Sequence, residues 1–279
     1  MNLNRIIESA EKQYKQILEE YFISVYNERS LPSHGIDHHR RVWKYSRELL
    51  KFVHAKNKKQ LSILTSELII ASYMHDIGMS VDPGIKHGKY SKDLCARFLA
   101  INNLLINDYL NVLEAVENHD NKEYIENSSR NNLLTVLSVS DDLDAFGFIG
   151  IYRYIEIYLI RETGPENLGL LIKTNAARRF GNFEKTFGKA KKLIETHQQR
   201  YLVLNDFFTK YNEQLPSYQF GTINPSGYCG VIELFGIMIN NKMELNELIT
   251  YSEKYSEEPV INWFFSELSS ELLVEHKVL

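Results

Sequence analysis

Residues 61–78 read LSILTSELIIASYMHDIG, an apolar stretch that closes with a histidine, an aspartate and a glycine. Leu68, Ser72 and His75 recur at steps of four and three, which is the spacing of one helix face. The pattern predicts a helix over 61–77 that ends before Gly78. His75 and Asp76 would then lie where the inner face of that helix stops.

The same helical period recurs through most of the chain, which has only six prolines and fourteen glycines to interrupt it. The sequence therefore predicts an all-α protein with no sheet larger than a hairpin. Residues 30–36 read as a loop, 163–183 as mixed structure and 221–227 as a turn. The expected helices cover residues 5–26, the end of the first loop to about 53, 61–77, 89–101, 106–119, 131–146, about 184–213, 229–254 and 258–275.

The composition is that of an ordinary globular protein, with 44% hydrophobic and 24% charged residues in 279, which excludes a disordered or fibrous class. A net charge of −4 gives no reason to expect nucleic acid as a partner. Cys95 and Cys229 form no paired motif, which favours a reducing, cytoplasmic location. The N-terminus has no signal-peptide pattern and no window nears about 18 uncharged apolar residues, so we expect no membrane partner.

A change in motif content near residues 155–165 divides the chain. We expect a helical domain at 1–155 and a helical C-terminal extension at 156–279, which either stands apart or packs with the first as one wall of a pocket. The apolar stripe of the 5–26 helix is compatible with two structures, a helix that packs within the domain or a short dimerising coiled coil. The oligomeric state therefore stays open.

Six metal-competent side chains share one kind of position, because each lies where the apolar face of an expected helix ends. Several helices would thus aim these side chains at one point in the core. Two carboxylates and four imidazoles are costly to bury without a cation to neutralise them. The six residues are His38, His75, Asp76, His87, His119 and Asp141.

Three longer motifs surround these positions. Residues 38–42 read His-His-Arg-Arg-Val, residues 73–78 read Tyr-Met-His-Asp-Ile-Gly, and residues 140–147 read Ser-Asp-Asp-Leu-Asp-Ala-Phe-Gly. Over roughly residues 30–155 the chain resembles the HD superfamily of metal-dependent phosphohydrolases, whose pattern is H…HD…D. The resemblance implies an HD-domain helical bundle with one metal ion bound by His38, His75, Asp76 and Asp141.

His87 and His119 resemble the two additional histidines of the binuclear branch of that superfamily. With a shared Asp76 they would hold a second divalent ion, and two ions about 3.5–4 Å apart clamp an in-line displacement at phosphorus. Imidazole and carboxylate ligands suit iron, manganese, nickel or zinc without choosing among them. Alternatively, the two histidines contact the substrate phosphate above a single ion.

The chain departs from the family at Met79, where many members have a lysine after His-Asp-x-Gly. The phosphate charge would then need another partner, and the candidates are Lys86, Lys89, Arg153, Arg178 and Arg179. Spacing singles out none of them, and we take the first three as the candidate substrate contacts. Asn-Lys-Glu-Tyr at 121–124 also replaces the Gly-Tyr-Pro element of the HD-GYP subgroup. Cleavage of cyclic dinucleotides is therefore disfavoured.

The activity that the resemblance implies is hydrolysis of a phosphate ester or anhydride, with a nucleotide as the first expectation for the small-molecule substrate. Asp76 and His34 are the expected catalytic residues. His34 lies four residues before His38 and would protonate the leaving group. Two other classes stay open, namely a binuclear-iron oxygenase of the same fold and a nucleotide-binding HD protein without catalysis.

Overall fold

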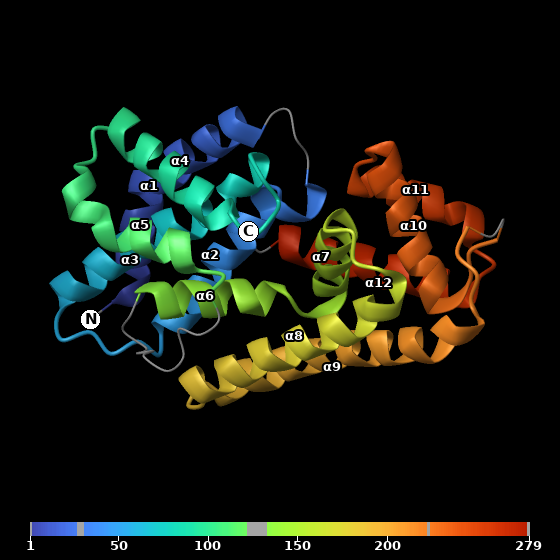
Figure 1. The fold of residues 1–279 in the computed structure, drawn as a ribbon. Helices are drawn as coiled ribbons and strands as arrows, with labels where there is room; N and C mark the ends of the chain where they lie inside the picture. Colours follow the sequence, from blue (N-terminus) through green and yellow to red (C-terminus); the bar gives the residue numbers. More distant parts are fainter. Residues whose placement is uncertain (1, 27–30, 122–132, 222–223, 278–279) are drawn as a thin grey trace. The chain divides into compact units, whose positions relative to one another are not determined.

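A computed structural model describes residues 2–26, 31–121, 133–221 and 224–277, and these residues form helices with no strand among them (Figure 1). The all-α prediction is therefore confirmed for the described chain. The chain divides into two compact units. The first unit comprises Met1–Asp144 and Gly181–Lys191, and the second comprises Ala145–Phe180 and Lys192–Leu279.

The first unit is a bundle built around one apolar helix, α3 (Lys58–Met74). Leu68, Ile69 and Ile70 are all fully buried, because neighbouring helices cover the C-terminal part of α3, residues 67–74, on every side. Those neighbours are α1 (Leu3–Tyr26), α2 (Ile36–Leu50), α4 (His87–Ile101), α5 (Leu110–Asn118) and α6 (Leu133–Asp144). The described residues of this unit also form three short 3₁₀ turns, η1 (Pro32–His34), η2 (Ile77–Ser80) and η3 (Ile106–Tyr109).

The two ends of α3 follow from local chemistry. Asn57 caps its first turn by accepting a hydrogen bond from the backbone N–H of Gln60 at 2.9 Å. The helix ends at Met74 rather than at residue 77, and the chain passes at once into η2. Gly78 permits this close passage, because an added Cβ would lie 2.2 Å from the carbonyl oxygen of His87.

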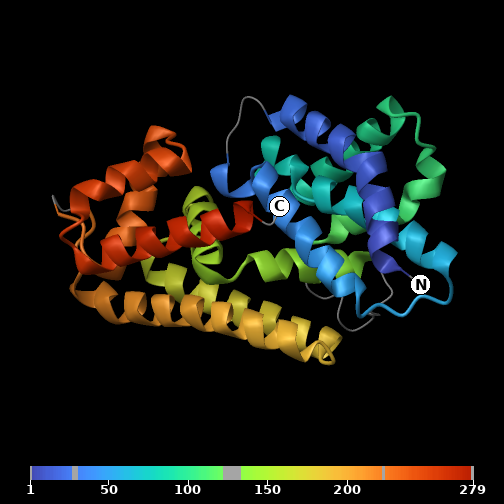
Figure 2. The ribbon, with the colours of Figure 1, turned by 180° about the vertical axis from the view of Figure 1, so that it is seen from behind.

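The N-terminal helix α1 lies along α2 and α3 (Figure 2). Its apolar stripe is buried inside its own unit, and a polar contact adds to that packing. The Glu19 carboxylate accepts hydrogen bonds from Arg40 of α2 at 2.7 and 3.0 Å, and from the Tyr73 hydroxyl of α3 at 3.0 Å. The 5–26 stripe therefore acts as a packing face within the unit.

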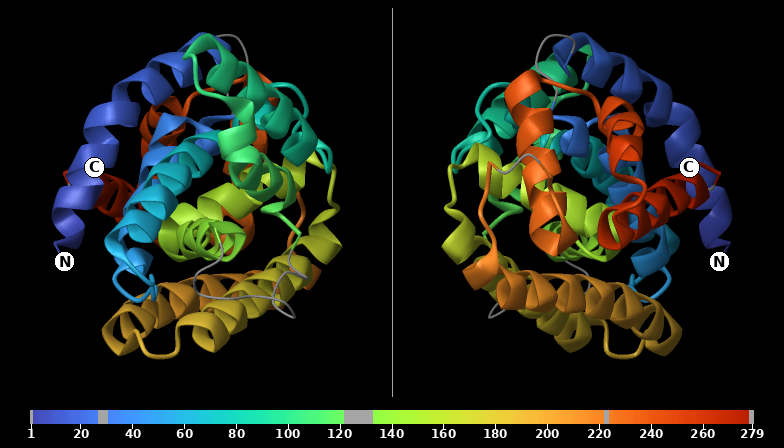
Figure 3. Two further views of the ribbon diagram at one scale, coloured as in Figure 1. Left: turned by 90° about the vertical axis from the view of Figure 1, so that its left-hand side faces the viewer. Right: turned by 90° about the vertical axis from the view of Figure 1, so that its right-hand side faces the viewer.

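The second unit packs α7 (Gly147–Ile160) against α10 (Gly227–Asn241) and α12 (Pro259–His276). Its core is aromatic, with the Phe235 ring centroid 5.4 Å from that of Tyr152 and 5.9 Å from that of Phe264. Figure 3 shows the remaining helices. They are α8 (Pro165–Phe187, up to Phe180 in this unit), α9 (Lys191–Gln214) and α11 (Leu245–Ser252), with the turns η5 (Leu215–Ser217) and η6 (Glu253–Tyr255).

Several predicted elements of the C-terminal half need correction. Residues 163–183, expected to be mixed, lie mostly within the continuous helix α8. The single helix expected at 229–254 is interrupted at Lys242, whose φ of 53° is left-handed, and Glu244 then caps α11. Residues 147–160 form α7 although no separate helix is predicted there. Residues 131–132 and 222–223 of predicted elements lie outside the described residues.

Among the described helices, none combines the length and the apolar character needed to cross a membrane. The predicted division into residues 1–155 and 156–279 stays a prediction, because a compact unit is not by itself an independently folding domain.

Candidate metal centre

The six residues predicted as ligands all lie in the first unit, at the ends of five helices, and none is more than 4% exposed. Polar groups buried this deeply need partners that compensate for lost water. Their places are the first turn of α2 (His38), the residues after α3 (His75 and Asp76), the start of α4 (His87), the residue after α5 (His119) and the last turn of α6 (Asp141).

Three of the four histidines have Nδ1 engaged by a backbone carbonyl three residues earlier in the chain. The pairs are His75 with Ser72 at 3.0 Å, His87 with Gly84 at 2.8 Å and His119 with Val116 at 2.8 Å. A carbonyl oxygen only accepts hydrogen bonds, so in each neutral ring Nδ1 carries the proton. The other ring nitrogen, Nε2, is then left with a lone pair.

The Nε2 atoms face one another in two pairs. His38 Nε2 lies 3.1 Å from His75 Nε2, and His87 Nε2 lies 3.4 Å from His119 Nε2. The fourth Nδ1, on His38, is engaged by the Asp144 carboxylate at 2.8 Å, so this ring also turns a lone pair inward. Two facing lone pairs repel each other unless a cation lies between them. The donor set therefore fits a divalent metal ion at each pair.

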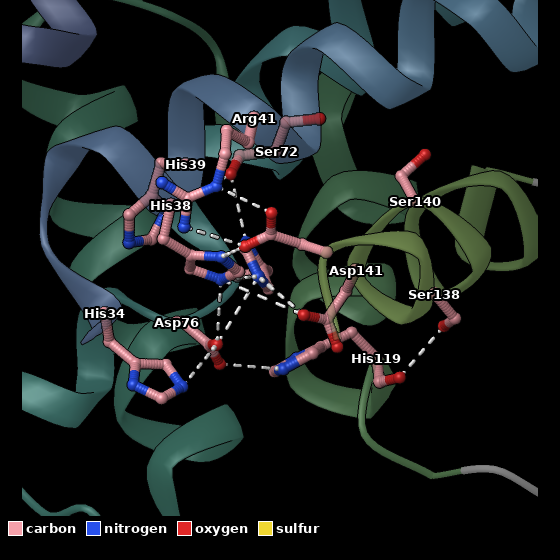
Figure 4. Close-up of polar contacts among 12 residues, drawn as sticks. His34, His38, His39, Arg41, Ser72, Asp76, His119, Ser138, Ser140 and Asp141 are labelled. Atoms are coloured by element: carbon pink, nitrogen blue, oxygen red, sulfur yellow. Dashed lines mark hydrogen bonds and ion pairs between the residues drawn. The ribbon is translucent and has the colours of Figure 1, made fainter. Parts of the chain in front are cut away.

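Asp76 serves both pairs, with one carboxylate oxygen for each. Its Oδ1 lies 2.9 Å from His119 Nε2 and 3.4 Å from His87 Nε2. Its Oδ2 lies 3.3 Å from His38 Nε2 and 3.4 Å from His75 Nε2. Figure 4 shows this carboxylate between the rings of His38 and His119. A carboxylate in this position has the geometry of a bridge between two cations.

Asp141 belongs to one of the pairs. Its Oδ1 lies 3.8 Å from His38 Nε2 and 3.9 Å from His75 Nε2. The described residues thus contain two adjacent buried groups that could hold metal ions, with the ligand atoms of each group within 4.8 Å of one another. One group is His38, His75, Asp76 and Asp141, and the other is Asp76, His87 and His119.

The surroundings favour the ligating protonation states of two key side chains. Burial lowers the pKa of His75 to about 3, so this imidazole is neutral near pH 7. Burial by itself would raise the pKa of Asp76, but His75 and His119 outweigh it and hold this pKa well below its usual range. Asp76 in turn outweighs burial at His119 and raises the pKa of that ring. Neutral imidazole and ionised carboxylate are the forms that bind metal.

His34 lies at the edge of this centre. It is on η1, its Nδ1 is 2.7 Å from Ser33 Oγ, and its Nε2 is 3.9 Å from Asp76 Oδ2. The ring is buried and points towards Asp76 in Figure 4. The structure thus places His34 beside the ligands, although it is a member of neither metal-binding group.

The three residues predicted as substrate contacts belong to different units. Lys86 and Lys89 lie at the start of α4, on either side of His87 in the chain, and both are exposed. Arg153 is buried in α7 of the second unit. Met79, where a family lysine is expected, is also buried. The contacts of all three basic residues with substrate stay predictions.

Sequence reasoning missed the residues that support the ligands. Asp144 and Arg41 lie within the quoted motifs, three residues after Asp141 and His38, but the motifs assign them no partner. Ser138 also escaped notice, although its hydroxyl donates a hydrogen bond to the His119 carbonyl at 2.9 Å. The spacing of three residues was the available signal, because it places a supporting side chain on the same helix face as the ligand.

No protein-family model and no curated protein sequence matches the chain. Among solved structures, it is similar to the crystal structure of a structural genomics target from Lactobacillus plantarum, with 17% sequence identity and a TM-score of 0.46. The match covers 73% of this chain and 97% of that chain. A likeness of this size carries no inference about activity.

Proposed function

We propose that this protein is a metal-dependent phosphohydrolase of the HD type that binds two divalent ions. One observation carries the proposal: the two oxygens of the Asp76 carboxylate each face one pair of histidine Nε2 atoms. A carboxylate shared in this way suits two cations about 3.5–4 Å apart, the arrangement that serves in-line displacement at phosphorus. The ligand set is all nitrogen and oxygen, which suits iron, manganese, nickel or zinc.

The proposed reaction adds water across a P–O bond of a phosphate ester or anhydride. Bound divalent ions supply a water of lowered pKa, about 7, and neutralise the non-bridging phosphate oxygens. Asp76 holds the centre together, and His34 is the proposed proton donor to the leaving oxygen. The place of His34 supports this role, since its Nε2 lies 3.9 Å from Asp76 Oδ2 and the ring is buried beside the proposed ligands.

The proposed substrate is a small phosphate-bearing molecule, with a nucleotide as the first choice by analogy with the resembling family. Lys86 and Lys89 flank His87 at the N-terminus of α4, where backbone N–H groups and the two ammonium groups attract phosphate. Arg153 is the third proposed contact. We also propose a cytoplasmic location, which suits the two free, buried cysteines, Cys95 and Cys229.

A phosphoesterase panel tests the proposal. Metal-free protein receives manganese, cobalt or ferrous iron and is assayed for release of phosphate or nucleoside monophosphate from nucleotides. We expect release that chelation abolishes and that anaerobic conditions leave intact. His75→Ala should be inactive while its far-ultraviolet spectrum stays helical.

Two results would contradict the proposed reaction. Protein that binds two ions but cleaves nothing in the panel is not a phosphohydrolase of these substrates. Turnover that requires oxygen and consumes it with iron bound would place the protein with the binuclear-iron oxygenases, which the same ligand set would serve.

A further inference from the structure

His38 differs from the other three histidines in what holds its ring. The carbonyl three residues earlier, on Gly35, accepts the backbone N–H of His38 at 3.0 Å. The ring Nδ1 instead lies 2.8 Å from Oδ2 of Asp144, a residue 106 positions further along the chain. His38 is therefore the one described ligand histidine whose outer nitrogen contacts a carboxylate and not a backbone carbonyl.

Asp144 is itself fixed in place by Arg41. Arg41 Nε donates to Asp144 Oδ1 at 2.7 Å and Arg41 Nη2 donates to Asp144 Oδ2 at 3.0 Å, so the guanidinium holds both oxygens. Both side chains are buried, and the positive charge of Arg41 compensates the carboxylate. The carboxylate therefore cannot rotate away from His38 without breaking two charged hydrogen bonds.

The chain arranges this support through its helical repeat. Arg41 follows His38 by three residues on α2, and Asp144 follows Asp141 by three residues on α6, so each shares a helix face with a proposed ligand. Helices α2 and α6 pack against each other. The contact that brings His38 to Asp141 thus also brings Arg41 to Asp144, directly behind the ligands.

We propose that Asp144, held by Arg41, is a positioning residue that fixes His38 as the Nδ1–H tautomer and directs its Nε2 lone pair at the ion of the His38 group. The inference rests on the metal centre proposed above. A carboxylate behind a ligating imidazole orients the ring and makes it a stronger donor, and loss of such a partner lowers metal affinity by about 10–100-fold. Asp144 has no such role at the ion of His87 and His119.

A purely structural role for the ion pair makes a different prediction. If Asp144 and Arg41 only join α2 to α6, removing the charge lowers stability and leaves the metal affinity of the folded protein unchanged. Metal affinity measured on folded protein therefore separates the two roles, and it does not depend on any substrate.

The experiment compares Asp144→Asn and Asp144→Glu with wild type. Glu19→Gln is the matched control, because it breaks another ion pair of α2, with Arg40, that touches no ligand. Metal-free protein is titrated with Co²⁺ against a competing chelator, the Co²⁺ absorption spectrum is recorded, and circular dichroism confirms folding. We expect Asp144→Asn to bind one of its two ions about 10–100-fold more weakly with a changed spectrum. Asp144→Glu should recover part of the loss, and Glu19→Gln should match wild type.

Repeating the Asp144→Asn substitution in a His87→Ala variant identifies which ion is affected. In His87→Ala the remaining ion is that of the His38 group, so adding Asp144→Asn should weaken it by the same factor. Folded Asp144→Asn with both ions at wild-type affinity would overturn the positioning role and leave the metal centre standing. Wild type that binds no ion would instead remove the metal centre itself.

If Asp144→Asn does not fold, wild type still gives an answer. Histidine ¹H–¹⁵N spectra of the zinc-loaded protein report which nitrogen carries the proton and which binds metal, with His38 assigned by its substitution. We expect a protonated Nδ1 and a zinc-bound Nε2 at His38. Zinc on Nδ1, or an Nδ1 without a proton, would overturn the inference.

Discussion

Asp76 is the residue on which both proposed ions depend, because it is the ligand common to the two groups. Its position directly after His75, between the end of α3 and the start of η2, lets the carboxylate stand between the histidine pairs. Six buried polar side chains without a cation would leave facing lone pairs and an ionised carboxylate poorly compensated. The chemistry of the centre therefore depends on how this one carboxylate is shared.

Asp76→Asn tests the sharing. The substitution keeps the shape of the side chain but replaces one oxygen with an amide nitrogen that cannot ligate and removes the charge. We expect bound metal, measured by mass spectrometry after gel filtration, to fall from two ions per chain to fewer than one. Asp141→Asn is the matched comparison, because Asp141 is a member of the His38 group and not of the other, so this substitution should remove one ion. Two ions retained in Asp76→Asn would contradict a bridging role.

His87→Ala and His119→Ala test the second ion separately. Each removes one Nε2 from the Asp76 Oδ1 side and leaves the His38 group intact. We expect each variant to bind about one ion where wild type binds two, with metal content as the measurement. If wild type never exceeds one ion under saturating manganese or iron, these histidines are contacts for substrate phosphate instead.

At this scale the motifs predicted which side chains meet but not how each is held. His38, His75, Asp76, His87, His119 and Asp141 do converge. The Nδ1 partners depend on backbone carbonyls at helix ends and on Asp144 of α6, and no periodicity reports those contacts. The sequence also could not predict the surroundings of Arg153. A charged residue on an apolar helix gives no sign of which group it will face.

At the scale of elements, the ligands are placed by the close packing of helix ends. Gly88 lies at the start of α4, next to His87, and an added Cβ would lie 2.4 Å from the carbonyl oxygen of Glu117 in α5. Gly88→Ala should therefore push α4 from α5, lower the free energy of unfolding by about 1–3 kcal/mol and weaken the second ion. Denaturant titration and metal content are the measurements.

Gly236→Ala is the control for Gly88. Gly236 lies within α10 with no heavy atom within 4 Å of an added Cβ. Alanine there should be neutral or stabilising by up to about 1 kcal/mol, because it restricts the unfolded chain and favours helix. An equal loss in the free energy of unfolding for Gly88→Ala and Gly236→Ala would mean that Gly88 is not needed for the close approach of α4 and α5.

Glu19 makes the attachment of α1 dependent on pH. Burial would raise the pKa of Glu19, but the hydrogen bonds from Arg40 and Tyr73 outweigh burial and lower it. A carboxyl group with a lowered folded pKa stabilises the fold above its unfolded pKa and loses that contribution as pH falls through the folded value. Glu19→Gln should thus destabilise the protein at pH 7 and much less at pH 3, measured by denaturant midpoints. An equal loss of stability at pH 7 and pH 3 would indicate that Glu19 contributes independently of its charge.

Element boundaries were predicted well where the apolar stripe was strong and poorly where packing overrode local preference. In 163–183, glycines and Thr174 weaken the helical signal, yet Leu168, Ile172 and Phe180 are buried on one face of α8. The break at Lys242 requires a left-handed residue that is not glycine, and such a position has little signature in a single sequence.

At the scale of the whole molecule, the chain order does not follow the compact units. Gly181–Lys191, from the last turns of α8 to the first residue of α9, belongs to the first unit although the preceding residues belong to the second. Each compact unit therefore comprises two separate stretches of the sequence. The six ligands predicted from the motifs nevertheless all lie within Met1–Asp144 of the first unit.

The metal centre should couple ion binding to the stability of that first unit, because its ligands come from the ends of five helices. Binding to the folded state stabilises it by mass action, and free metal at 100 times the dissociation constant adds about 2.7 kcal/mol per ion. For a unit of this size that corresponds to a rise in Tm of roughly 5–10 °C. Thermal scans of metal-free wild type with and without added manganese measure the rise, and a chelator should reverse it. Asp76→Asn should show little rise under the same conditions. An equal rise in wild type and Asp76→Asn would mean that the stabilising ion binds somewhere else in the molecule.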